Sequence, residues 1–311
     1  MAKGLFTAGL AALFHDTPST ASLVDWLSEH GDVERLPSGW MGVDPLVLSF
    51  RPEANGRLVV DVVSSGWPDA MGSVEEDPDL FGAWAMGGYG PFAFPGGLSR
   101  AVEQSWRWPG AGAAVASHKA FVRLRCTYGI GAEPDQAVVP ADYDPLAELL
   151  FLHELAATLP GASALFNMNG EVLQPPRVVQ QRLQDGKANG YVPIDVFSNV
   201  RLFQIGPSWS LMDTVGMAQV DRPDVEAAFD GRVDPNEVAG FLRNIDLYLL
   251  EAGDVVETGH TLDGPGGPWV ASRHDEAWVA PPRPTVTLTP VGTTPPTDLF
   301  PQRPQREPRE L

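Results

Sequence analysis

Two acidic stretches hold the side chains whose types and spacing could support chemistry or recognition. The first contains Glu75, Glu76, Asp77 and Asp79, and the second contains Asp221, Asp224, Glu226 and Asp230. A pair of carboxylates could hydrolyse a substrate as general acid and base, but no histidine, metal triad or nucleophile accompanies the second stretch. We therefore interpret both stretches as exposed surfaces that bind a partner.

The segment before the second stretch contains one further carboxylate. Apolar residues surround Asp213 in LMDTVGMAQV, for which we predict a strand over residues 211–220 and a turn over residues 221–229. An inward-pointing carboxylate in such a strand needs a partner, and arginine is the expected one. The chain has only three lysines, Lys3, Lys119 and Lys187, so we expect internal pairs between arginine and carboxylate.

A second group of residues could form a metal or acid–base site: His260, Asp263, His274 and Glu276. Alternation along a strand would place His274 and Glu276 on one face and Asp275 on the other. One imidazole and one carboxylate are too few ligands for a metal without distant help. We favour a structural or solvated role here, and a hydrolase that uses this region remains the alternative.

Other catalytic motifs fail on their spacing. His153 and Glu154 lie side by side, but a zincin needs a second histidine where the chain has Ala157. The segment DGRVDPNEV does not fit a calcium-binding loop, because Arg232 stands at the third position, which needs an oxygen ligand, and Pro235 stands where the sharp turn needs glycine. The single cysteine, Cys126, excludes an internal disulfide and a multi-thiolate metal site, and we expect it to be buried in a strand. We predict no cofactor and no metal.

The composition indicates a globular protein with an acidic surface. The net charge of −19 over 311 residues disfavours direct binding to nucleic acid and favours a basic protein partner, although solubility alone could explain it. No apolar run approaches the roughly 20 residues that a membrane span requires. The opening segment GLFTAGLAALF lacks a convincing signal-peptide cleavage site, so we expect a cytoplasmic protein.

The spacing of apolar and turn residues predicts an α+β fold with mixed or antiparallel sheets packed against a few helices. The clearest helices are expected over residues 144–161 and 234–253, each with aspartate then proline at its start and glycine at its end. We predict a single domain over residues 1–290, with similar lobes 1–112 and 113–290 as one division. A proline-rich tail, 291–311, is expected to be extended or disordered.

Several segments, in this order along the chain, resemble an uncharacterised bacterial family called domain of unknown function 4261. They are PFAFPGGLSRA, HKAFVRLRCTYG, NMNGEVL, FSNVRLF, LMDTVGMAQVDRPDVEA, FLRNIDLYLL and GHTLDGPGG. The resemblance extends from about Phe6 to Pro290. The family has no established catalytic motif to carry over.

The resemblance implies association with bacterial competition loci, and similarity to immunity proteins of type VI secretion nuclease effectors. An acidic inhibitor could then cover the basic substrate channel of a toxin without chemistry of its own. The expected partner is therefore a cognate toxin with a basic surface, and the protein is not expected to be an enzyme. An adaptor for effector loading is a further alternative, and an exposed sheet edge would permit a homodimer.

Overall fold

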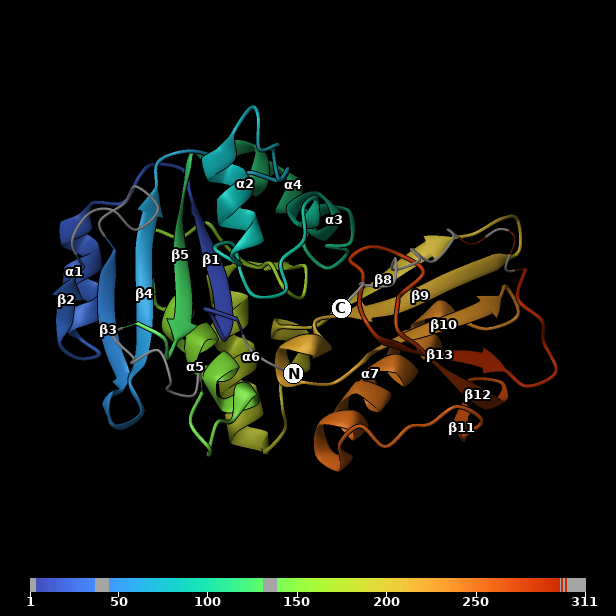
Figure 1. The fold of residues 1–311 in the computed structure, drawn as a ribbon. Coiled ribbons are helices and arrows are strands. Elements are labelled where there is room, and N and C mark those ends of the chain that lie inside the picture. Colours follow the sequence, from blue (N-terminus) through green and yellow to red (C-terminus); the bar gives the residue numbers. More distant parts are fainter. Residues whose placement is uncertain (1–3, 37–44, 131–138, 297, 299, 301–311) are drawn as a thin grey trace. The chain divides into compact units, whose positions relative to one another are not determined.

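The chain divides into two units in a computed structural model that describes residues 4–36, 45–130, 139–296, 298 and 300 (Figure 1). Unit 1 covers Met1–Phe197 and unit 2 covers Ser198–Leu311. The lobe boundary expected between residues 112 and 113 lies inside unit 1. There β4 (Gly56–Val63) and β5 (Ala120–Thr127), from opposite sides of that boundary, pair antiparallel.

Unit 1 is built on a seven-stranded sheet in the order β2-β3-β4-β5-β1-β6-β7, in which every pair is antiparallel. The central strand β5 has alternating side chains, so Phe121, Arg123 and Arg125 point to one face and Cys126 to the other. Besides β4 and β5, the strands are β1 (Ala8–Phe14), β2 (Val33–Arg35), β3 (Leu46–Arg51), β6 (Ala164–Asn167) and β7 (Val172–Gln174).

Helices cover both faces of this sheet. The helix α5 (Pro145–Ala157) contacts β1 and β5, and α6 (Pro176–Asn189) packs against α5. Asp144 caps α5 by accepting hydrogen bonds from the backbone N–H groups of the first turn, as its sequence predicted. The remaining helices are α1 (Thr20–Ser28), α2 (Pro78–Ala85), α3 (Gly97–Glu103) and α4 (Ala111–Ser117), with short 3₁₀ turns at Pro52–Ala54 and Ile194–Val196.

An irregular insertion over residues 66–95 covers the face of the unit 1 sheet that carries Phe121. Its aromatic side chains Trp67, Trp84 and Tyr89 are buried, and the ring centroids of Trp67 and Phe121 lie 5.1 Å apart. Side chains of α3 and α4 join the same cluster. These rings therefore attach the insertion to the body of unit 1.

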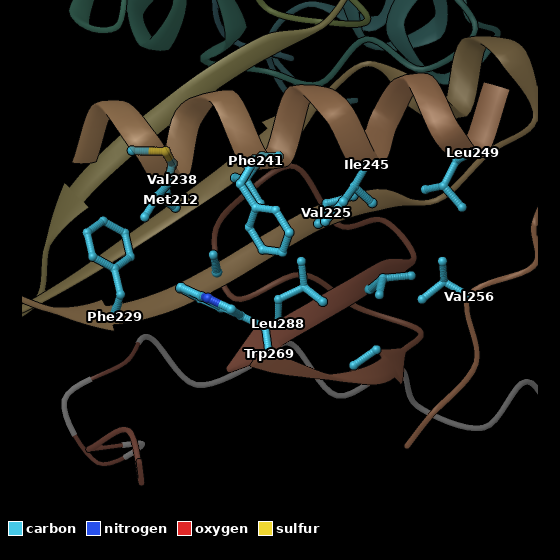
Figure 2. Packing of buried hydrophobic residues seen from close by; sticks show 14 residues of the cluster. Met212, Val225, Phe229, Val238, Phe241, Ile245, Leu249, Val256, Trp269 and Leu288 are labelled. Atoms are coloured by element: carbon cyan, nitrogen blue, oxygen red, sulfur yellow. The ribbon is translucent and has the colours of Figure 1, made fainter. Parts of the chain in front are cut away.

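Unit 2 is a six-stranded sheet in the order β11-β12-β13-β10-β9-β8, with α7 (Pro235–Ala252) packed on one face (Figure 2). Apolar side chains of α7, including Phe241 and Ile245, pack against Trp269 and Leu288 of the sheet. The strands are β8 (Asn199–Gln204), β9 (Trp209–Val215), β10 (Asp224–Asp230), β11 (Thr261–Gly264), β12 (Gly267–His274) and β13 (Thr285–Pro290). The pair β10 and β13 is parallel and the others are antiparallel.

The prediction of a strand over residues 211–220 followed by a turn is wrong. β9 ends at Val215, a 3₁₀ turn spans Met217–Val220, and residues 224–230 form the strand β10. Gly216, directly after β9, has a φ of +133°. A residue with a side chain would be strained in this backbone conformation, and the strand ends here. The β10 residues alternate between faces, with Val225 and Phe229 in the core under α7.

The α+β class predicted from the sequence is confirmed, with helices on mixed and antiparallel sheets. The predicted tail begins directly after β13, and its residues 297, 299 and 301–311 lie outside the described residues. Phe300 is buried, with its ring centroid 4.5 Å from that of Trp278. Within the described ranges, no helix has both the length and the apolar character that a membrane crossing needs.

Candidate functional site

The first acidic stretch lies on the surface at the start of α2. Glu75, Glu76, Asp77 and Asp79 are all exposed. Asp77 caps the helix, because its Oδ1 accepts a hydrogen bond from the backbone N–H of Leu80 at 3.0 Å. The positive end of the helix dipole stabilises carboxylates at this position. These four side chains therefore form an exposed anionic surface, in which the backbone of α2 holds Asp77.

The outward face of α2 continues this surface. Trp84 points into the core, whereas Met86 directly after the helix is 61% exposed. Gly82 faces outward, since a Cβ atom built on it would meet nothing within 4 Å. Asp79, Gly82 and Met86 have the three- and four-residue spacing that places side chains along one helix face. The insertion thus combines a buried aromatic face with an exposed face that is acidic at one end and apolar at the other.

The second acidic stretch is not an exposed surface, which corrects our expectation. Asp224 and Glu226 are buried in β10, so neither can contact another protein. Asp221 is half-buried after the 3₁₀ turn, and Asp230 is half-buried in an ion pair with Arg232. Alternation along β10 directs residues 224 and 226 to the face of the sheet opposite α7. A segment over residues 275–284 covers that face.

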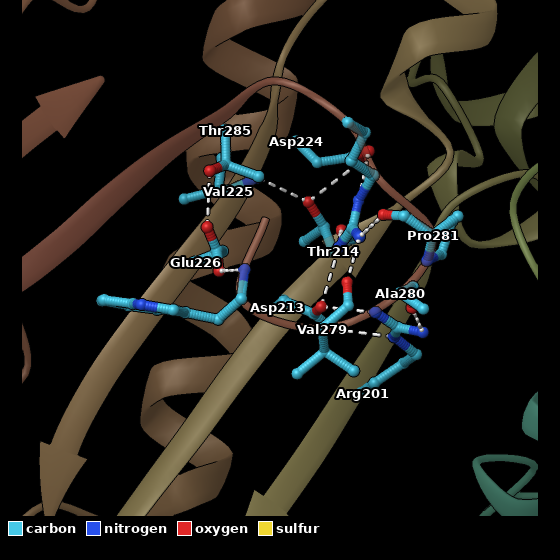
Figure 3. A network of polar contacts seen from close by, with 12 residues as sticks. Arg201, Asp213, Thr214, Asp224, Val225, Glu226, Val279, Ala280, Pro281 and Thr285 are labelled. Atoms are coloured by element: carbon cyan, nitrogen blue, oxygen red, sulfur yellow. Dashed lines mark hydrogen bonds and ion pairs between the residues drawn. The ribbon is translucent and has the colours of Figure 1, made fainter. Parts of the chain in front are cut away.

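The buried carboxylate of Asp213 is paired with two arginines, which confirms the partner expected for it (Figure 3). Arg201 Nη2 lies 2.5 Å from Asp213 Oδ2, and Arg283 Nη2 lies 2.7 Å from the same oxygen. Arg283 Nε also lies 3.0 Å from Asp224 Oδ2. Two guanidinium groups and two carboxylates thus balance one another within the fold.

The same network holds the covering segment in place. The backbone N–H of Trp278 donates to Glu226 Oε2 at 2.9 Å, and Arg201 Nη1 donates to the carbonyl oxygen of Ala280 at 2.8 Å (Figure 3). Thr285 Oγ1 donates to Glu226 Oε1 at 2.5 Å. Because these contacts satisfy backbone groups of a segment without regular structure, the buried charges have an architectural role.

The carboxylate of Asp246, on α7, lies near that of Asp224, and Thr214 contacts both. Thr214 Oγ1 is 3.3 Å from Asp224 Oδ1 and 3.3 Å from Asp246 Oδ1, and both carboxylates are buried. Burial raises the pKa of Asp224 to about 6, although Arg283 opposes the change. Burial and the nearby Asp224 raise the pKa of Asp246 well above its ordinary value. Both carboxyl groups therefore keep a proton to a higher pH than an exposed aspartate does.

Residues 213–289 match the family model described as Domain of unknown function (DUF4261). Unit 2 carries this DUF4261 domain. The match begins at Asp213 and includes Asp224, Glu226, Asp246 and Arg283, so most of the buried charge network belongs to it. No curated protein and no solved structure shows significant similarity to the chain. The exposed acids at residues 75–79 lie in unit 1, outside the DUF4261 match.

The alternative site within the DUF4261 domain does not assemble as a metal centre. His260 and Asp263 are exposed, whereas Glu276 is buried and His274 is half-buried. His274 Nε2 lies 3.2 Å from Ser272 Oγ. β12 ends at His274, so strand alternation does not extend to Glu276. No group of three or more histidine, cysteine, aspartate and glutamate side chains in the described part of the chain could hold a metal ion.

The remaining candidates in unit 1 are structural. His153 is buried, and its Nδ1 lies 2.7 Å from the Leu149 carbonyl oxygen. Burial lowers the pKa of His153 to about 4, so the ring is neutral at pH 7. Burial raises the pKa of the Cys126 thiol, which opposes formation of a nucleophilic thiolate.

Two buried charge sites of unit 1 escaped sequence analysis. Asp61 on β4 pairs with Arg123 and Arg125 of β5, with Arg125 Nη2 2.8 Å from Asp61 Oδ1. Glu148 on α5 accepts hydrogen bonds from Tyr128 Oη at 2.8 Å and from Thr7 Oγ1 at 2.5 Å. The alternating arginines in FVRLRC were the available signal for the first site, and the general expectation of internal arginine–carboxylate pairs is confirmed.

Proposed function

We propose that this protein is a cytoplasmic immunity protein that binds and neutralises a cognate toxin of bacterial competition in a stoichiometric complex. The toxin is a type VI secretion effector, a nuclease with a basic surface. The observation that carries the proposal is the exposed carboxylate group at Glu75, Glu76, Asp77 and Asp79 in a chain with a net charge of −19.

The distribution of arginine supports this function. Arg123, Arg125, Arg201 and Arg283 are buried, and each is paired with a buried carboxylate. These cations are therefore not on the surface, where they could offset the exposed acids. A surface with excess negative charge accelerates the approach of a basic partner and disfavours acidic competitors. Nuclease domains are suitable partners because the site that holds a phosphate backbone needs positive charge.

Co-expression with the toxin encoded beside its gene tests the proposal. We expect the protein to restore growth of cells that make the toxin, and to co-purify with the toxin in a fixed ratio. Binding should weaken as salt rises from 50 to 500 mM, because screening reduces attraction between exposed charges. An unrelated basic protein such as cytochrome c provides the control for non-specific attraction. Absence of both rescue and co-purification would exclude the proposed function.

A further inference from the structure

Asp246 on α7 is a buried carboxyl group without a counter-charge. Its side chain is 0% exposed, and it contacts Thr214 Oγ1 at 3.3 Å and Ser198 Oγ at 3.4 Å. In the part of the chain that the structure describes, Asp246 forms no ion pair, whereas Asp213 and Asp224 each lie within 3.0 Å of Arg283. Hydrogen bonds from a hydroxyl group to a charged carboxylate are shorter, about 2.5–2.7 Å. Both the burial and the contact lengths therefore indicate a protonated carboxyl group.

The hydrogen atoms available at Thr214 lead to the same conclusion. Thr214 Oγ1 accepts a hydrogen bond from the backbone N–H of Val225 at 2.9 Å and lies 3.3 Å from Asp224 Oδ1 (Figure 3). The same oxygen lies 3.3 Å from Asp246 Oδ1. A hydroxyl group has one hydrogen, so it donates to only one of the two carboxyl groups. The other contact is a hydrogen bond only if that carboxyl group carries a proton and donates it to the remaining lone pair of Oγ1.

The surroundings of the two carboxyl groups place the proton on Asp246. Asp224 Oδ1 accepts a hydrogen bond from the backbone N–H of Met217 at 3.0 Å, and Asp224 Oδ2 lies 3.0 Å from Arg283 Nε. A backbone donor and a guanidinium group both favour the ionised form of a carboxyl group. Among the described residues, the hydrogen-bond partners of Asp246 are hydroxyl groups, which accept as readily as they donate. In this Thr214 bridge, Asp246 therefore donates to Thr214, and Thr214 donates to Asp224.

Charged side chains on the surrounding elements also act on the Thr214 bridge. They are Arg243 on α7, Asp224 on β10, Asp213 on β9, Arg201 on β8 and Arg283 in the segment over residues 275–284. Burial and the charge of Asp224 raise the pKa of Asp246 by more than Arg243 lowers it. Arg201 and Arg283 are both paired with Asp213, so neither is reserved for Asp246. The balance of these charges keeps the proton on Asp246.

We propose that the protonated carboxyl group of Asp246 is a pH-sensitive switch that holds α7 against the sheet of unit 2 through the Thr214 bridge. When Asp246 releases its proton to the solvent at high pH, one hydroxyl hydrogen remains for two negative charges, which repel each other across Thr214. The attachment of α7 then weakens, whereas β9 and β10 stay paired through their own backbone hydrogen bonds. This switch lies within unit 2 and is independent of the proposed toxin-binding function.

Infrared difference spectroscopy of the whole chain at pH 7 tests where the proton lies. A protonated carboxyl group has a C=O stretch that is distinct from the bands of a carboxylate. The spectrum of the wild type minus that of Asp246→Asn should contain the protonated band. The control variant Asp263→Asn changes an exposed aspartate of the same unit and should leave this band in place. A protonated band that disappears in Asp224→Asn but persists in Asp246→Asn, or that depends on neither residue, would overturn the assignment.

Hydrogen exchange of α7, corrected for intrinsic rates, tests the switch itself. Because the pKa of Asp246 is raised from 3.8 on folding, its contribution to stability is complete below pH 3.8 and is lost as the pH rises through the folded value. Above pH 6, where Asp224 has ionised, the equilibrium constant for opening of α7 should rise by up to about tenfold per pH unit until Asp246 loses its proton.

Asp246→Asn keeps an N–H donor toward Thr214 but cannot titrate, so this rise should be absent in that variant. Asp263→Asn should behave as the wild type does. If the protection of α7 in the wild type does not change above pH 6, or if Asp246→Asn shows the same rise, Asp246 is not the switch.

Discussion

The stretches at residues 75–79 and 221–230 each contain four acids, yet they differ in how far the fold buries them. The first lies in an irregular insertion, where Asp77 and Pro78 begin a short helix and leave every carboxylate exposed. The second contributes to β10, where Asp224 and Glu226 project from the sheet and are buried beneath the segment over residues 275–284. A carboxylate on a covered face of a sheet loses its water and therefore needs hydrogen bonds or cations from its neighbours.

The difference separates two uses of negative charge. In unit 2, Asp213 and Asp224 are paired with arginine, so their charge contributes little to the field outside the protein. In unit 1, no ion pair among the described residues involves Glu75, Glu76, Asp77 or Asp79. The surface charge available to a partner is therefore set by which acids are left without an arginine, more than by the total number of acids.

Removal of Asp213 should have the largest effect on stability. Asp213→Ala leaves Arg201 and Arg283 buried beside each other without their shared carboxylate, which costs about 3–5 kcal/mol in the free energy of unfolding. Urea denaturation followed by circular dichroism measures this loss. Asp79→Ala is the control from the exposed stretch and should change stability by less than about 0.5 kcal/mol. A similar loss in both variants would contradict the contrast between the two stretches.

Unit 2 should lose stability as the pH rises. The pKa of Asp224 is raised from 3.8 to about 6 in the folded state, so folding takes up protons between these values. The resulting contribution, about 3 kcal/mol, is complete below pH 3.8 and is lost as the pH rises through 6. Hydrogen exchange of α7 between pH 4 and 7, corrected for intrinsic rates, measures it. Asp246→Asn removes the neighbouring titrating carboxyl and should reduce the slope.

The buried histidine of unit 1 should respond to pH with the opposite sign. The pKa of His153 is lowered from 6.5 to about 4, so its contribution is complete above pH 6.5 and is lost as the pH falls through 4. Protection of α5 should therefore decrease on acidification while protection of α7 increases. Parallel changes in the two helices would show that other groups dominate the pH response of at least one unit.

Within the exposed stretch, Asp77 should matter most for stability. Asp77→Ala removes the side-chain acceptor at the start of α2 and should cost about 1 kcal/mol. Asp77→Asn keeps an acceptor at this position and should restore most of the loss. Thermal unfolding followed by circular dichroism distinguishes the two variants. If both variants match the wild type, the cap does not stabilise α2.

The smallest effect on stability is expected at Glu76, which is exposed and outside the helix. Glu76→Gln should change the free energy of unfolding by less than about 0.5 kcal/mol, since it preserves the shape of the side chain. The same variant removes one negative charge from the exposed stretch, so toxin binding should become less sensitive to salt. A stability loss comparable to that of Asp77→Ala would assign Glu76 a structural role.

Local sequence patterns were sufficient where an element carries its own start and stop signals. Asp144 and Asp234 cap α5 and α7 as predicted. The pattern was not sufficient for β10, because its acids resemble those of an exposed turn. Its burial depends on a parallel neighbour, β13, which lies about 60 residues later in the chain.

The sequence by itself determined the α+β class, the two capped helices, the excess of negative charge and the need of Asp213 for an arginine. Only the tertiary structure decided which acids face water, because pairing between distant strands brings Arg201 and Arg283 to Asp213 and places Glu226 under the segment at Trp278. The composition gives the number of charged residues, whereas burial and the distance to an opposite charge decide whether each charge stabilises the fold or faces the solvent.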